Sequence, residues 1–152
     1  MEWAEVVNNP LLKNLPFKIE LNKWGNILMS PASNNHGIRQ YNMVEVLQQK
    51  KTGQIIIECS IQTNEGVRVA DVAWASDQFM TDHGDETPYK SAPEICIEVM
   101  SPSNSKEEMS EKIRLYLEKG ACEVWLCGKN SDIFYYGING QITHSLELYK
   151  KH

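Results

Sequence analysis

The chain has 152 residues, 41% of them hydrophobic and 23% charged, which is typical of one globular domain and excludes a disordered body. Its formal net charge is −5, whereas proteins that bind duplex DNA tightly and without a partner usually carry an excess of basic residues. That charge remains compatible with a local basic groove, or with a metal-dependent enzyme that binds its substrate weakly.

Neither the cysteines nor the apolar segments indicate export or a membrane. The four cysteines form no Cys-x-x-Cys pair and three lie in apolar runs, which favours reduced core thiols over a zinc site or disulfides. No signal-peptide pattern and no run of about 18 apolar residues occurs. We therefore expect a cytoplasmic protein without a membrane partner.

The first third of the chain predicts an arm, a hairpin and a helix. Residues 1–16 form a short helix or an arm, which carries Trp3, Val6, Val7, Leu11 and Leu12 and could pack on a second subunit. Residues 17–21 and 26–30 alternate as two strands around a turn at 22–25. From residue 35 the apolar spacing becomes helical, and Gly53 closes that segment.

The middle of the chain predicts three strands. Residues 54–62 are a β-branched run, and residues 67–76 alternate so that Asp71 shares a face with Val67, Val69 and Ala73. Residues 76–92 lack periodicity and predict a solvated acidic loop. Residues 93–100 are apolar apart from Glu98, the pattern of a central strand.

The last third predicts a helix, a strand and a hairpin. Residues 105–108 are a capping box that opens a helix ending near Gly120, a buried strand follows, and Asn139-Gly140 marks a closing turn. The helix joins two strands that both look central, so it should cross over between parallel strands. From residue 35 the order is helix, strand, strand, strand, helix, strand, an α/β fold with a mixed sheet.

Asp71 and Glu98 are carboxylates inside apolar strands, where a lone charge is costly unless it is paired or bound to a metal. Each could instead cap a loop or pair with a cation, the candidates being Arg68, Lys106 and Arg114. On successive strands, however, the two carboxylates could converge on one Mg²⁺ ion, which prefers one or two carboxylates and keeps water and phosphate oxygens as its other ligands.

Lys112 is a candidate third member of this site. It lies at the edge of the apolar stripe formed by Met109, Ile113 and Tyr116 on the predicted helix. Such a lysine commonly extends its ammonium to water while its stem covers the core. Alternatively, it points toward the carboxylates, where an ammonium would orient water or stabilise charge on a phosphate.

Four blocks of the chain resemble the Uma family of bacterial restriction-endonuclease-like proteins: MSPASNNHG, VRVADVAWAS, APEICIEVMSPSNSKEE and EKIRLYLEKGACEVWL. The resemblance covers about residues 17–137 and is most specific over 92–126. It implies a PD-(D/E)XK nuclease fold, in agreement with the order of elements. It also implies hydrolysis of DNA phosphodiester bonds with Mg²⁺ or Mn²⁺, and a homodimer would suit cleavage of both strands.

The resemblance assigns the site residue by residue. Asp71 and Glu98 match the metal-binding carboxylates, Lys112 matches the helix lysine, and the accessory matches are Glu20, His36 and Tyr116. Two positions depart from the family pattern. Ala70 replaces a proline, and Met100 replaces a basic residue that, two positions after Glu98, would share its strand face.

Three functions remain open from the sequence. The first is a metal-dependent DNA endonuclease. The second is a catalytically impaired member of the fold that serves as a binding or interaction module, which Met100 and the acidic charge favour. The third is an unrelated metallohydrolase of small phosphoesters, because nothing in the residues identifies DNA chemically.

Overall fold

A computed structural model describes all residues, 1–152. Its strands are β1 (Phe17–Leu21), β2 (Ile27–Pro31), β3 (Gln54–Thr63), β4 (Gly66–Ala75), β5 (Ile95–Val99), β6 (Glu123–Cys127), β7 (Ile133–Gly137) and β8 (Gly140–Ile142). Its α-helices are α1 (Trp3–Asn8), α2 (Asn34–Leu47), α3 (Asp77–His83) and α4 (Lys106–Glu118), and a 3-10 turn spans Glu147–Tyr149. No helix has the length and apolar character needed to cross a bilayer.

The core is a six-stranded mixed sheet in the order β3-β4-β5-β6-β7-β8. β5 and β6 are parallel, and every other neighbouring pair is antiparallel. The connection through α4 between β5 and β6 is the crossover that the sequence predicts. The helix–strand–strand–strand–helix–strand order and both hairpins are therefore confirmed.

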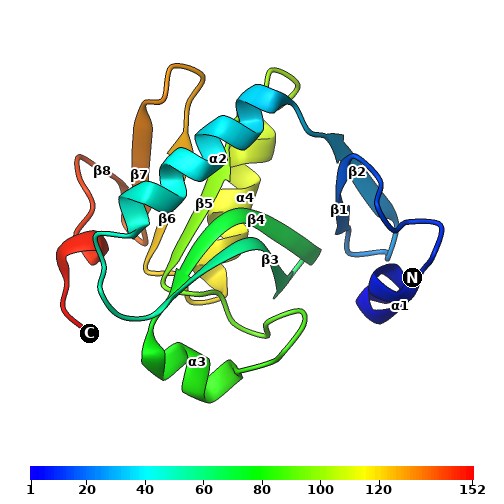
Figure 1. The fold of residues 1–152 in the computed structure, drawn as a ribbon, viewed down its shortest axis with the longest axis horizontal. Helices are drawn as coiled ribbons and strands as arrows, with labels where there is room; N and C mark the ends of the chain where they lie inside the picture. Colours follow the sequence, from blue (N-terminus) through cyan, green and yellow to red (C-terminus); the bar gives the residue numbers. More distant parts are fainter.

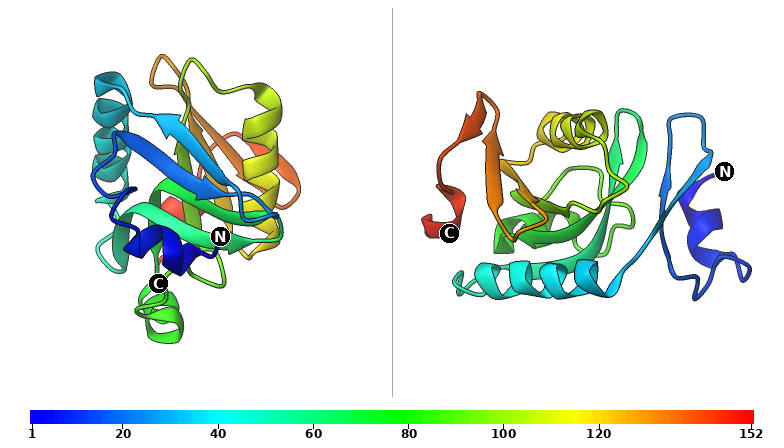
Figure 2. Two further views of the ribbon diagram at one scale, coloured as in Figure 1. Left: turned by 90° about the vertical axis from the view of Figure 1, so that its right-hand side faces the viewer. Right: turned by 90° about the horizontal axis from the view of Figure 1, so that it is seen from above.

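Helices cover both faces of this sheet (Figure 1). On one face α2 buries Met43 and Leu47 against Val72 and Trp74, and on the other α4 buries Tyr116 among the small side chains of β4. Figure 2, seen from above, shows the sheet between these two helices. Burial of one such side chain stabilises the fold by about 1.5–3 kcal/mol, so the two apolar layers provide most of the driving force for folding.

The β1–β2 hairpin lies outside the six-stranded sheet, at the end opposite β8 (Figures 1 and 2). Val6 of α1 and Leu21 of β1 form a small apolar cluster with Val67 of β4, and Trp3 and Leu12 pack against it. Part of the apolar surface of the N-terminal arm is thus covered by the chain's own hairpin.

The prediction of an irregular loop over residues 76–92 is wrong in its first half. Residues 77–83 form α3, whose N-cap is Ser76, with its hydroxyl accepting a hydrogen bond from the Phe79 amide. Phe79 is buried, against the ring of Tyr89. A helix of two turns with one core contact produces too little periodicity to be distinguished from a loop.

Candidate active site

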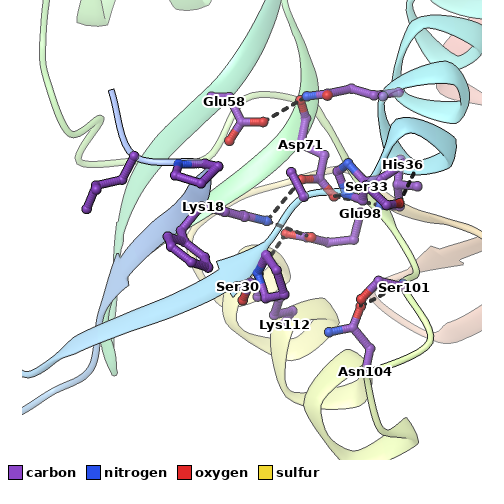
Figure 3. Close-up of a pocket in the computed structure, with 18 of the residues that line it drawn as sticks. Lys18, Ser30, Ser33, His36, Glu58, Asp71, Glu98, Ser101, Asn104 and Lys112 are labelled. Atoms are coloured by element: carbon purple, nitrogen blue, oxygen red, sulfur yellow. Dashed lines mark hydrogen bonds and ion pairs between the residues drawn. The ribbon is translucent and has the colours of Figure 1, made fainter. Parts of the chain in front are cut away.

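Asp71 of β4 and Glu98 of β5 lie on neighbouring strands and are buried, with 1% and 2% of their surfaces exposed. The Lys18 ammonium joins them, with Nζ 3.1 Å from Asp71 Oδ1 and 3.0 Å from Glu98 Oε2 (Figure 3). Two carboxylates that share one cation must lie close together. The structure therefore brings the two predicted carboxylates to a common point.

A break in the β3–β4 ladder places Asp71 there. The register runs through Ile57–Val72 and resumes at Cys59–Ala70, so Glu58 and Asp71 are not paired. Glu58 adopts a φ of 55°, a left-handed conformation that costs free energy in a residue with a Cβ. The strict alternation that the sequence predicts for β4 also fails at this break: Ala70 and Ala73 contact the same core cluster.

Gln40 of α2 donates hydrogen bonds at this break in the ladder. Its side-chain amide donates to the Asp71 carbonyl oxygen at 2.7 Å and to Glu58 Oε1 at 2.9 Å. A backbone oxygen left without a ladder partner needs such a donor when it is buried. The irregularity is thus supported by a specific contact from the helix that covers this face.

The hairpin contributes a residue that the sequence prediction missed. Lys18 and Glu20 are two positions apart on β1, so both side chains point from the same face of the hairpin into the site. Lys18 pairs with both strand carboxylates, and Glu20 Oε2 accepts a hydrogen bond from the Val69 amide at 2.7 Å. The two-residue spacing of Lys18 and Glu20 on one predicted strand is the feature of the sequence from which Lys18 could have been predicted.

Helix α4 contributes Lys112 and Tyr116, one turn apart. Lys112 Nζ lies 2.8 Å from Glu20 Oε2 and 3.2 Å from Glu98 Oε1, and the Tyr116 hydroxyl donates to Glu98 Oε1 at 2.7 Å. Of the two alternatives for Lys112, the structure has the ammonium turned toward the carboxylates. None of the cations considered from sequence, Arg68, Lys106 and Arg114, pairs with Asp71 or Glu98.

His36 approaches from the first turn of α2. Its Nε2 lies 3.4 Å from Asp71 Oδ2, and the Val99 amide donates to the same oxygen at 2.7 Å. The Ser33 side chain caps the helix by accepting from the His36 amide, which fixes the backbone that carries the ring. All six residues predicted from the sequence lie in this one cluster.

Burial and ion pairing act in opposite directions on the charges of this cluster. Burial raises the pKa of Asp71, but Lys18 and His36 outweigh it and hold the pKa well below its usual range. Burial raises the pKa of Glu98 and is only partly offset by Lys112 and Lys18. Burial would lower the pKa of Lys18, yet Glu98 and Asp71 raise it well above its ordinary value.

A cavity of about 330 Å³ opens over the cluster. It lies between the β1–β2 hairpin, the start of α2 and the start of α4, and the labelled side chains of Figure 3 point into it. Its walls include Lys18, His36, Asp71, Glu98 and Lys112. The site is therefore accessible from solvent although its charged groups are largely buried.

The donor set at the cavity floor suits a hard divalent cation. Asp71 Oδ1 and Glu98 Oε2 contact only the Lys18 ammonium, and the open cavity leaves room for water or phosphate oxygens. No group of three or more His, Cys, Asp or Glu side chains is arranged to hold an ion. The residues fit a cation held by two carboxylates and solvent, as Mg²⁺ commonly is.

Met100 directly follows the last residue of β5. β5 ends at Val99, and the Met100 side chain is not part of the cavity wall, whereas Glu98, Val99 and Ser101 are. The Met100 carbonyl oxygen instead accepts a hydrogen bond from the buried Arg39. The Met100 amide still donates to the Cys127 carbonyl oxygen at 2.9 Å, so hydrogen bonding to β6 reaches this residue although its side chain does not line the cavity.

The mixed sheet, its order of elements and the carboxylate–lysine cluster define a restriction-endonuclease-like protein. A crystal structure described as a putative nuclease of the DUF820 family, from Anabaena variabilis, matches with a TM-score of 0.64 and 19% identity. The match covers 78% of this chain and 71% of that one. At this identity the likeness shows the fold.

The chain belongs to the Uma2 family, whose model, described as "Putative restriction endonuclease", matches residues 9–147. The family expected from the sequence blocks is thereby confirmed, and the match extends beyond the blocks at both ends. A search of the curated proteins found no match to the chain.

Proposed function

We propose that this protein is a metal-dependent endonuclease that hydrolyses DNA phosphodiester bonds, with Asp71 and Glu98 as the ligands of a Mg²⁺ or Mn²⁺ ion. The observation that carries the proposal is the pair of buried carboxylates, each with one oxygen directed to a common cation position under an open cavity. Membership of a family described as restriction endonucleases supports nucleic acid as the substrate.

The bound ion would supply a Lewis acid that lowers the pKa of bound water and offsets charge on a phosphate oxygen. Tyr116 and Lys112 hold Glu98 through its other oxygen, so its coordinating oxygen has a fixed orientation. His36 and the Val99 amide do the same for Asp71. We assign Lys112 the role of the ammonium nearest to the developing phosphate charge.

A catalytically impaired binding module is the alternative. It is favoured by the net charge of −5, by the absence of a basic residue at position 100, and by an ammonium already paired with both carboxylates. Such a protein would keep the buried ion cluster for stability alone. The two functions differ in whether a divalent ion binds and whether DNA is cleaved.

Calorimetric titration with Mg²⁺ and Mn²⁺ tests the proposal. We expect wild type to bind one ion, and Asp71→Asn and Glu98→Gln each to lose detectable binding, because each removes one of two charged ligands. Asp85→Asn is the matched control, since Asp85 is exposed and outside the cavity. Supercoiled and branched DNA should then be nicked by wild type and the control only. Ion binding without cleavage would favour the impaired alternative, and unchanged binding in both site variants would exclude the metal site.

We further propose that the 152 residues act as one domain and that two copies associate. Exposed apolar side chains remain on the N-terminal arm, at Val7 and Leu11, and on the C-terminal hairpin, at Phe134. Contiguous apolar surface that stays exposed commonly marks a protein interface. Two sites in one particle would suit cleavage of both strands of a duplex.

A further inference from the structure

Each of the two buried carboxylates uses one of its oxygens inside the protein. Asp71 Oδ2 accepts a hydrogen bond from the Val99 amide at 2.7 Å and contacts His36. Glu98 Oε1 accepts from the Tyr116 hydroxyl at 2.7 Å. These oxygens already have partners that belong to the rigid strands and helices around the site, so they are poor candidates to change partner.

The other two oxygens depend on a single residue. Asp71 Oδ1 and Glu98 Oε2 each have one partner, and for both it is the Lys18 ammonium. The Lys18 side chain is 13% exposed and forms part of the cavity wall, whereas both carboxylates are deeply buried. Lys18 therefore stands between the two oxygens best suited to bind a cation.

We propose that the Lys18 ammonium is a built-in occupant of the cation position, and that a divalent ion binds Asp71 and Glu98 only by displacing it. This inference rests on the proposed function, because it concerns the same ion site. An ammonium and a divalent ion in contact with the same two oxygens would lie within a few ångströms of each other, and their repulsion in a partly buried site is strong. Metal binding and the Lys18 contacts are thus mutually exclusive.

This arrangement has a consequence for each state of the protein. Without metal, Lys18 neutralises two neighbouring carboxylates that would otherwise repel each other, and so stabilises the fold. Metal binding must replace that contact, which weakens the measured affinity for the ion. The displaced ammonium remains at the cavity wall beside the ion, because β1 fixes the backbone that carries it.

The test is a comparison of Lys18→Met with wild type by Mn²⁺ calorimetry and by thermal unfolding. Methionine keeps an unbranched stem but removes the charge. We expect Lys18→Met to bind Mn²⁺ about tenfold more tightly or better, because competition and repulsion are both removed. Its metal-free form should melt lower than wild type, and Mn²⁺ should raise its melting temperature more than that of wild type. Lys23→Met, an exposed lysine in the hairpin turn, should behave as wild type.

Equal or weaker Mn²⁺ binding by Lys18→Met, with measurable binding by wild type, would overturn this inference and leave the proposed function intact. No binding by either protein would overturn both. A second measurement uses no variant at position 18: lysine side-chain NMR of wild type, with the Lys18 signal assigned through its bonds to the backbone. Saturating Mg²⁺ should shift the Lys18 ε-methylene signal, and an unchanged signal while Mg²⁺ binds would contradict displacement.

Discussion

Glu20 links the hairpin to both the sheet and α4. Its Oε2 accepts from the Val69 amide and lies 2.8 Å from Lys112 Nζ. Burial alone raises the pKa of Glu20, but Lys112 and Lys18 outweigh burial and lower it. A carboxylate whose pKa is lower in the folded than in the unfolded state stabilises the fold above its unfolded pKa. That contribution disappears as the pH falls through the folded pKa.

Glu20→Gln should therefore destabilise the protein at pH 7 by about 1–3 kcal/mol, the range for loss of a buried charged hydrogen-bond partner. The difference from wild type should shrink as the pH falls below the ordinary carboxyl pKa and through the lowered pKa of Glu20, where the wild-type carboxylate itself becomes protonated. Urea unfolding of the metal-free proteins at pH 7, 5 and 3.5 measures this. Glu45→Gln, at an exposed position of α2, is the control. A difference that stays constant with pH would contradict the role of the Glu20 charge.

At the scale of elements, the hairpin that carries Lys18 and Glu20 lies against the β3–β4 turn at Gly66. Gly66 has a φ of +99°, and a Cβ there would come within 2.1 Å of the Leu21 carbonyl oxygen and 2.5 Å of the Asn22 backbone. A backbone contact of this kind cannot be relieved by rotation of a side chain. The close approach therefore requires glycine, and it positions the hairpin over the site.

Gly66→Ala should push the hairpin away and cost about 1–3 kcal/mol for the strained backbone alone. It should also weaken Mn²⁺ binding, because the cavity loses its hairpin wall. Gly137→Ala is the matched control, since Gly137 lies outside the cavity and a Cβ there meets only the Cys122 carbonyl oxygen, at 3.9 Å. Thermal unfolding and Mn²⁺ calorimetry of both variants provide the measurement. Equal stability of the two variants would show that the hairpin is not held at Gly66.

At the scale of the whole molecule, the N-terminal arm and the β7–β8 hairpin lie at opposite ends of the fold (Figure 2), and both carry exposed apolar side chains. The hairpin cluster already covers Val6, which leaves Val7 and Leu11 of the arm exposed. We expect light scattering at micromolar concentration to give twice the mass of one chain, and Leu11→Glu to shift it toward the single chain. Light scattering of Ile138→Glu, at an exposed position in the β7–β8 turn, tests whether the C-terminal hairpin forms the interface instead. A single-chain mass for wild type would contradict the dimer.

Apart from α3, which it predicted as a loop, the sequence by itself determined the order of elements, because β-branched runs, capping residues and turn glycines are local signals. It also identified Asp71 and Glu98, because a carboxylate inside an apolar strand is conspicuous without any knowledge of its neighbours. The resemblance to the family added Glu20, His36 and Tyr116. These signals need no information about contacts between distant segments.

Only the tertiary structure showed which cation contacts both Asp71 and Glu98. Lys18 lies 53 residues from Asp71 and 80 from Glu98 in the chain, and the hairpin that carries it belongs to a separate sheet. No local pattern encodes such a contact. The break at Glu58 also depends on tertiary packing, since Gln40 of α2 donates to the backbone oxygen of Asp71. Strand periodicity assumes a regular ladder, and it fails where another element supplies the hydrogen bonds.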